Sequence, residues 1–326
     1  MIYEDLVYWR MKIDEPVVIE IMASKEMQRL KWVDWAWYFE PFFHWTAHSR
    51  FEHSVWVYLL LKKYWAPIEE QIAWLIHDLS HGTFSHCLDY VFEEWNPKEQ
   101  SHQDNTFDEF VRSSSLPLIL DKYWWSLEHI LDDSRHPLKE NNLPDICADR
   151  IDYCLRDAVH YKNISIEEIN SILNNLIAID NAWVFSTFEI AKKYTKIFSD
   201  MNDIWSGIEA AVMFSTVWDF LKYAWNKWYV KRDDFYTTDK EVLGRINKYL
   251  HTDGKLNLLR DRMNNKIPFE NNPNDYDNNV FCKSRIVDPL FMKEWEIFRI
   301  SDMDKDFWSI VTNKSKVKEY FIKFKK

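Results

Sequence analysis

The apolar positions of this chain repeat at helical spacing over most of its length. Residues 50–65 form one such run, which ends before Pro67, where the next run begins. Proline suits the first turn of a helix, because the N–H that it lacks would have no partner there. In the second run four residues share one face, at positions i, i+4, i+7 and i+8: Ile68, Ile72, Leu75 and Ile76. The pattern predicts two helices, the second ending at His77 and Asp78, and then a new helix with Ser85 as its N-cap.

A polar stripe marks a further helix that starts near Pro144. Its members follow at i, i+4, i+7, i+8 and i+11 and therefore share one face: Asp149, Tyr153, Arg156, Asp157 and His160. A solvated outer face is the usual origin of such a stripe. A mixture of Asp, Tyr, Arg and His without Lys or Glu is, however, also typical of a cleft lining. Both interpretations stay open at this point.

The character of the chain changes at about residue 231. Residues 165–230 continue as amphipathic helices, whereas the later part holds an Asn-rich stretch and the segment CKSRIVDPLFM (282–292). The β-branched centre of that segment predicts a strand. We therefore expect a mostly α fold, in which residues 1–230 form the helical core. Residues 231–326 would form a small mixed α/β subregion packed on the core, not an independent domain.

Composition and charge narrow the classes of partner. The chain has 326 residues and a formal net charge of −11, which argues against an extended nucleic-acid surface. An acidic protein that binds phosphates must hold its positive potential locally. The four cysteines include no CxxC pair, and no apolar run approaches the length of a membrane span. We expect a cytoplasmic protein that has no membrane partner.

Tryptophan is abundant and glycine is scarce. The chain has 18 Trp and 4 Gly, where average usage would give about 23 Gly. Several tryptophans stand where a turn normally calls for glycine: Trp45, Trp65 and Trp95. An indole replaces glycine at a cost wherever φ is positive or two backbones approach closely. The pattern favours a sequence altered from a Gly-containing parent over an unusual natural lineage, with impaired folding or activity as a possible consequence.

Four residues on or beside the predicted helices can hold a metal ion: His53, His77, Asp78 and Asp149. Neutral imidazoles and ionised carboxylates together suit one divalent ion, with Mn, Fe, Ni, Zn and Mg in descending order. Their spacing matches no zinc finger, no HExxH helix and no nucleophile elbow, and the chain has no Gly-rich phosphate loop. For any single histidine, a hydrogen-bonded core or surface role is the alternative.

Further polar residues lie close to these four in the sequence. Three histidines are suited to bind phosphate oxygens or to act as general acids: His81, His86 and His102. Asp89, three residues after His86, can orient an imidazole. Arg50 and Arg150 are candidates for phosphate contacts, with ordinary ion pairing as the alternative.

Five segments occur in the order typical of a known family: QRL (28–30), HSRFEHS (48–54), HDLSHGTFSH (77–86), DRIDYCLRD (149–157) and RIVDP (285–289). Together they resemble the HD-domain phosphohydrolases, in the branch of the deoxynucleoside triphosphate triphosphohydrolases. The resemblance implies that one divalent metal ion is bound by His53, His77, Asp78 and Asp149. It implies that the catalytic pocket is lined by His81, His86 and His102, with Asp89 supporting a histidine. It further implies phosphate contacts for Arg50 and Arg150 and sugar contacts for Tyr153 and Asp157.

The resemblance also implies a reaction. Water would attack the α-phosphorus of a nucleotide substrate, a dNTP, and release deoxynucleoside and triphosphate. A homo-oligomer, dimer or tetramer, is expected on the same ground. The chain departs from the family where Trp35 and Trp37 replace a Gln followed closely by Gly, and where Trp56 replaces a Gly. The alternatives are a nucleotidase or phosphodiesterase that uses the same site, or a nucleotide-binding sensor or scaffold without turnover.

Overall fold

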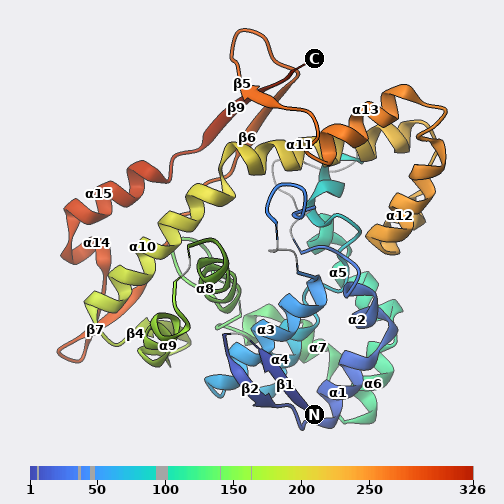
Figure 1. The fold of residues 1–326 in the computed structure, drawn as a ribbon. Helices are drawn as coiled ribbons and strands as arrows, with labels where there is room; N and C mark the ends of the chain where they lie inside the picture. Colours follow the sequence, from blue (N-terminus) through green and yellow to red (C-terminus); the bar gives the residue numbers. More distant parts are fainter. Residues whose placement is uncertain are drawn as a thin grey trace.

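Helices build most of the molecule in this computed structural model (Figure 1). The structure describes residues 1–5, 7–35, 38–44, 48–92, 102–139, 141–162 and 164–325. The helices are α1 (Pro16–Ala23), α2 (Lys25–Leu30), α3 (Arg50–Lys63), α4 (Ile68–Leu75), η1 (Ser85–Tyr90), α5 (His102–Ser113), α6 (Leu116–Lys122), α7 (Leu127–Leu131), η2 (Asp133–Arg135), α8 (Ala148–Lys162), α9 (Ile166–Asn174), α10 (Phe188–Trp205), α11 (Ile208–Asn226), η3 (Arg232–Tyr236), α12 (Asp239–Ile246), η4 (Asn247–Tyr249), α13 (Gly254–Met263), α14 (Ile300–Met303) and α15 (Lys305–Lys314). Among these, no helix is long and apolar enough to cross a membrane.

The strands are short and form three small sheets. They are β1 (Ile2–Asp5), β2 (Trp9–Lys12), β3 (Leu176–Ile179), β4 (Ala182–Phe185), β5 (Phe269–Asn271), β6 (Asn278–Cys282), β7 (Leu290–Lys293), β8 (Glu296–Arg299) and β9 (Lys318–Phe324). β1 pairs with β2, the order β3-β4-β7-β8 forms a second sheet, and β5-β9-β6 forms a third. The predicted fold class, mostly α with a small mixed C-terminal part, is confirmed.

Helix α3 lies at the centre of the core. Val57, Leu59 and Leu60 have no exposed surface, and the helix packs against α4 and α8. Its start is fixed by a capping box in which Ser49 accepts from the Glu52 N–H and Glu52 accepts from the Ser49 N–H. The predicted helix over residues 50–65 is therefore confirmed, and its first turn is held in place.

The polar stripe of α8 is buried. Arg156 pairs with Asp5 at 3.0 Å and with Asp152 at 2.9 Å, and its guanidinium stacks 3.6 Å from the centre of the Trp56 ring. The solvated interpretation of the stripe is wrong, except for the exposed His160. The charges are tolerated in the interior because each one has a partner.

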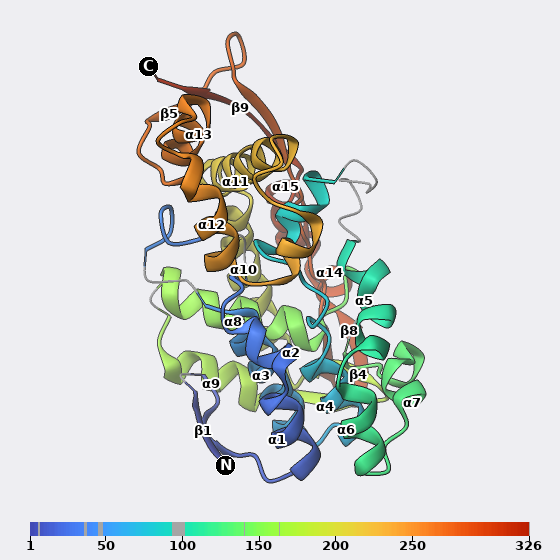
Figure 2. The same ribbon diagram turned by 90° about the vertical axis from the view of Figure 1, so that its right-hand side faces the viewer.

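The C-terminal part is joined to the core by strand pairing. β4 runs parallel to β7, with Val184 opposite Leu290, while β7 and β8 form a hairpin. Helices α11 and α13 and the β5-β9-β6 sheet lie at the end of the molecule opposite β1 and α1, in both views (Figures 1 and 2). Segments on both sides of residue 230 therefore share one sheet.

Two secondary-structure predictions are wrong. Leu176–Phe185, expected to be helical, forms the β3–β4 hairpin, whose turn residues Asp180 and Asn181 have φ of 48° and 65°. Such values suit a two-residue hairpin turn, and Asp and Asn tolerate them. The predicted strand over 282–292 is also wrong, because residues 283–289 have no regular secondary structure and β7 begins only at Leu290.

Four exposed tryptophans adopt left-handed backbone conformations. Their φ values are 53°, 63°, 61° and 70° for Trp65, Trp124, Trp228 and Trp295, and their side chains are 89%, 94%, 81% and 93% exposed. The first three follow the C-caps of α3, α6 and α11, where glycine is the usual residue. Trp295 lies in the β7–β8 turn. The glycine-like position expected for Trp65 is confirmed, whereas Trp45 and Trp95 lie outside the described residues.

Candidate metal centre

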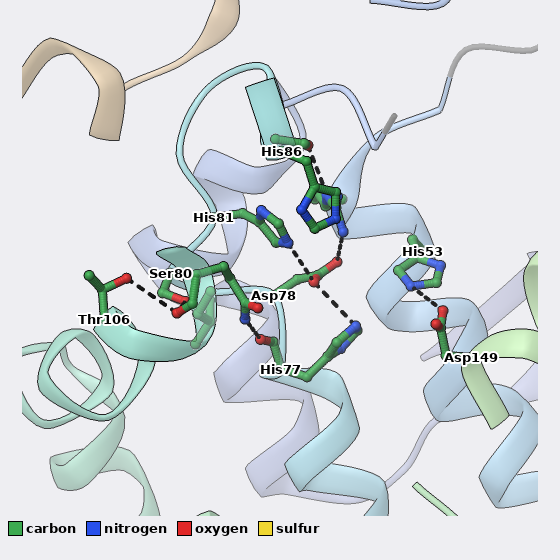
Figure 3. A network of polar contacts seen from close by, with 12 residues as sticks. His53, His77, Asp78, Ser80, His81, His86, Thr106 and Asp149 are labelled. Atoms are coloured by element: carbon green, nitrogen blue, oxygen red, sulfur yellow. Dashed lines mark hydrogen bonds and ion pairs between the residues drawn. The ribbon is translucent and has the colours of Figure 1, made fainter. Parts of the chain in front are cut away.

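Helix ends and turns from three parts of the chain bring the predicted metal ligands together (Figure 3). The ligand atoms of His53, His77 and Asp78 all lie within 4.8 Å of one another. His53 is in the first turn of α3, and the other two follow the end of α4 at Leu75. Asp149, in the first turn of α8, places its Oδ1 3.1 Å from Nε2 of His53. The predicted ligand set is thus assembled in space.

His77 is oriented by the backbone. Its Nδ1 lies 2.6 Å from the carbonyl oxygen of Trp74, which can accept only an N–H. The tautomer with the proton on Nδ1 leaves the lone pair on Nε2, which lies 3.2 Å from Oδ1 of Asp78. Burial lowers the pKa of His77 to about 4, so the imidazole is neutral at physiological pH. A neutral, oriented imidazole is the form that binds a metal ion.

Asp78 is a buried carboxylate held by Arg50. Burial acts to raise the pKa of Asp78, but the charge of Arg50 and the neighbouring imidazoles of His77, His81 and His53 together outweigh it, and the pKa lies well below its usual value. Arg50 donates to Oδ2 at 2.9 Å, while Oδ1 faces Nε2 of His81 at 3.3 Å. Arg50 is itself buried and donates from Nε to Ser85. It therefore positions a candidate metal ligand, and its predicted contact with phosphate stays a prediction.

The turn after the His-Asp pair has an unusual backbone. Phe84 and Ser85 have φ of 57° and 48°, and η1 begins there as a 3₁₀ helix. The Ser85 hydroxyl donates to the carbonyl oxygen of Asp34 at 2.6 Å, so the prediction that it caps a helix is wrong. A Cβ on Gly82 would lie 2.2 Å from Leu88 and 2.9 Å from the backbone of Phe235. Gly82 is thus required by close packing.

The second group of histidines lies beside this cluster. His81 is buried, and its ring meets that of His86 edge-on at 5.1 Å. Nδ1 of the half-buried His86 lies 3.6 Å from the carboxylate of buried Asp89. His102 is the first residue of α5, and its side chain is outside the described part of the structure. The structure therefore brings together three of these four residues and places the backbone of the fourth.

Gln103 connects α5 to the metal cluster. Its side-chain amide donates to the carbonyl oxygen of His77 at 2.6 Å, and its carbonyl oxygen accepts from Ser80 at 3.1 Å. The sequence analysis assigned no role to this residue. Its place directly after His102 is the signal that could have indicated one. Gln103 therefore links the start of α5 to the turn that carries His77 and Ser80.

The predicted sugar-binding residues form a buried wall on α8. The ring of Tyr153 lies 4.9 Å from that of Trp205 and 6.0 Å from that of Trp35. The Trp205 indole donates to Asp157 at 2.7 Å, and burial raises the pKa of this carboxyl to about 7. The guanidinium of Arg150 donates to the carbonyl oxygens of Asn141 and Asp145, in the loop before α8. Sugar and phosphate contacts for these residues stay predictions.

Trp35 lies against the centre of the site. Its ring is 5.3 Å from that of His53 and stacks on His48 at 4.9 Å, and Cζ of Arg50 lies 5.9 Å from the ring centre. Trp37, the second departure from the family pattern, lies outside the described residues. The indole of Trp35 therefore occupies space between α3 and α8 beside the candidate ligands.

Comparison with known proteins supports the interpretation of these motifs. Residues 50–157 match the HD domain family. The uncharacterised protein YdhJ of Bacillus subtilis is 34% identical over 288 residues, which cover 87% of this chain and 86% of YdhJ. The chain belongs to the HD-domain family. All four candidate metal ligands lie within the matched HD domain, and the family expected from the sequence motifs is confirmed.

Two further relatives of the HD domain have descriptive names. The metal-dependent phosphohydrolase cns2 of Cordyceps militaris is 30% identical over 214 residues, covering 63% of this chain and 61% of cns2. A Dictyostelium discoideum protein named a deoxynucleoside triphosphate triphosphohydrolase SAMHD1 homolog is 26% identical over 226 residues. That match covers 59% of this chain and 43% of the relative.

The HD-domain residues fit a divalent metal ion. Two imidazoles and two carboxylates supply nitrogen and oxygen donors, and the donor atoms of His53, His77 and Asp78 are already close together. Nδ1 of His53 is buried and has no hydrogen-bond partner among the described residues. Nε2 of the same ring faces Asp149 at 3.1 Å and is the nitrogen suited to bind the ion.

Asp239 of α12 forms hydrogen bonds to the backbone of two loops, at Asp34 and Phe84. Its ionisation is expected to make folding stability depend on pH. Its carboxylate accepts from the Asp34 N–H at 2.8 Å and the Phe84 N–H at 2.9 Å, and burial raises its pKa to about 8. The folded-state pKa lies above the unfolded-state pKa, which is near 4. The protonated carboxyl therefore stabilises the fold fully below pH 4, and this stabilisation is lost as the pH rises to about 8. The wild type should therefore lose unfolding free energy between pH 5 and 8, and Asp239→Asn should reduce this loss by roughly 4 kcal/mol.

Chemical denaturation at several pH values measures this difference. The wild type should lose stability over that interval more steeply than Asp239→Asn. Equal slopes for the two proteins would show that Asp239 is already ionised in the folded state.

Proposed function

We propose that this protein is a metal-dependent phosphohydrolase that cleaves dNTPs at the α-phosphorus into deoxynucleoside and triphosphate. The observation that carries the proposal is the convergence of His53, His77 and Asp78, with Asp149 beside His53. A divalent ion bound there, Mn²⁺ first among the candidates, would lower the pKa of bound water and stabilise charge on a phosphoryl oxygen.

The remaining residues supply positioning and proton transfer. Arg50 holds the Asp78 carboxylate in its ionised form, and the Trp74 carbonyl holds the tautomer of His77. His86 is half-buried, and its Nδ1 faces the buried carboxylate of Asp89. A carboxylate behind an imidazole raises its basicity, so His86 is the residue we assign to proton donation to the leaving oxygen.

The proposed specificity for deoxynucleotides is supported by the names of two relatives and by two residues of α8. The names of two relatives describe a phosphohydrolase and a deoxynucleoside triphosphate triphosphohydrolase homologue. Tyr153 and Asp157 lie on the α8 face that begins with Asp149, which suits contacts to a sugar next to the α-phosphate. Both are buried and oriented by Trp205, so they form a rigid wall that can exclude a 2′-hydroxyl.

A nucleotide sensor without turnover is the second candidate. Trp35 favours it, because its indole packs against His53 and lies near Tyr153. A nucleotide that enters must stack on this ring or displace it. The sensor would bind metal and nucleotide and form no product.

Product analysis tests the proposal. Purified protein is incubated with Mn²⁺ and each dNTP in turn, and the products are separated by ion-exchange chromatography. Deoxynucleoside and triphosphate in equal amounts, absent after chelation of the metal, are the expected result. Orthophosphate or a nucleoside monophosphate would indicate a different phosphate ester chemistry. Binding without product from the folded, metal-loaded protein would favour the sensor.

The homo-oligomer and the cytoplasmic location expected from the sequence stay predictions.

A further inference from the structure

The chain crosses the site a second time, far from the HD motifs. Residues 283–289, between β6 and β7, run past α8 and α10 without regular secondary structure. Arg285 in this segment donates to the hydroxyl of Tyr153 at 3.4 Å. Its charge also acts with those of His53 and His77 to lower the pKa of Asp149, against the effect of burial. The guanidinium therefore lies beside a candidate metal ligand.

Asn202 of α10 fixes this segment in place. The side chain of Asn202 is buried, its Oδ1 accepts from the Arg285 N–H at 3.0 Å, and its amide donates to Ser284 at 2.9 Å. Three residues further on, the Asp288 N–H donates to the carbonyl oxygen of Pro144 at 2.8 Å. Anchors on both sides of Arg285 leave little freedom to its backbone, so its direction is set by the fold.

Most N–H donors of the Arg285 guanidinium are not used by hydrogen bonds among the described residues. Within the described ranges it makes one hydrogen bond, the long one to Tyr153, and its side chain is exposed. Arginine carries five N–H donors in a planar fork that matches phosphate.

The other basic residues near the site are already engaged. Arg50 is buried against Asp78 and Ser85, and Arg150 donates to the loop that precedes α8. Three carboxylates surround the same space: Asp78, Asp89 and Asp149. The polyphosphate chain of a nucleotide carries several negative charges, so a protein with a net charge of −11 needs local cations to hold it.

We propose that residues 283–285 are the phosphate-binding arm of this site, in which Arg285 binds the β- and γ-phosphates of the substrate. The inference rests on the proposed nucleotide hydrolase function and adds the residue that recognises the phosphate chain. It assigns to the C-terminal part of the chain a direct role at a site whose metal ligands all precede residue 150.

Inorganic triphosphate tests the arm without the need for turnover. Calorimetric titration of Mn²⁺-loaded protein compares the wild type with Arg285→Gln, Arg285→Lys and Arg112→Gln. The last variant makes the same change at an exposed arginine paired with Asp108 and Glu128, away from the site. We expect Arg285→Gln to raise the Kd for triphosphate about tenfold or more, Arg285→Lys to restore part of the affinity, and Arg112→Gln to bind as the wild type does.

Two further measurements separate this role from a structural one. Arg285→Gln should unfold at the same temperature as the wild type, because the bond to Tyr153 is long, and it should still bind Mn²⁺, because all candidate metal ligands remain. Unchanged triphosphate affinity in Arg285→Gln would overturn the phosphate-binding arm and leave the hydrolase proposal intact. Failure of the wild type to bind triphosphate or any dNTP would overturn both.

Discussion

Replacing Trp65, Trp124, Trp228 and Trp295 together by glycine should raise the free energy of unfolding by about 2–4 kcal/mol. Each residue has a φ between 53° and 70°, and each side chain is at least 81% exposed, so almost no burial is lost. A left-handed backbone costs an L-residue about 1–2 kcal/mol, from which the greater freedom of glycine in the unfolded chain subtracts about 0.4–1 kcal/mol. The four positions belong to separate turns, so their effects should add.

Equilibrium denaturation of the quadruple variant measures this gain. Trp32→Gly is the matched control, because Trp32 is also 64% exposed but is not among the described residues with positive φ. Glycine at that position should give no gain, since it only adds freedom to the unfolded chain. A quadruple variant no more stable than the wild type would show that these turns relax at no cost.

Replacing His77 by alanine should abolish metal binding and lower the turnover of the proposed substrate by at least about 10³-fold. His77 presents a neutral Nε2 to the cluster, fixed by the Trp74 carbonyl, and the change removes one of the two imidazoles of the candidate ligand set. Groups that only hydrogen-bond to a metal ligand contribute roughly 10- to 100-fold to metal affinity or activity. Loss of a ligand itself should have a larger effect. The fold should persist, because His77 lies outside the apolar core.

Metal content after dialysis and single-turnover rates measure the two effects. His129→Ala is the control. This imidazole is exposed, pairs with Glu69 at 3.6 Å and is expected to contribute neither to metal binding nor to turnover. Full metal content in His77→Ala would remove this residue from the ligand set. Lost activity with retained metal would assign it to proton transfer instead.

The metal ligands were predictable because each stands at a marked position of a local pattern. The helical runs place His53 at the start of α3 and His77 just past α4, and the stripe of α8 begins with Asp149. Hydrophobic periodicity places these residues on or beside helices, and the resemblance to the HD-domain motifs indicates that they meet at one site.

Residues that act from a distance were not predictable in the same way. Asp239 and Asn202 look like ordinary surface polar residues in the sequence, and only the tertiary structure reveals what they bind. Their partners lie more than 80 residues away, and no local period encodes such pairs. The β3–β4 hairpin was predicted as helix, although the Asp180-Asn181 pair at its turn is a local signal for a two-residue turn.

The bonds from Asp239 also determine when the site can form during synthesis. All four candidate metal ligands have left the ribosome soon after residue 149. The backbone N–H groups of Asp34 and Phe84, however, find their acceptor only when α12 follows, and Asp288 reaches Pro144 later still. A nascent chain therefore carries its metal ligands for more than a hundred residues before the loops around them are fixed. Metal that arrives in that interval meets a looser set of donors than the finished protein offers.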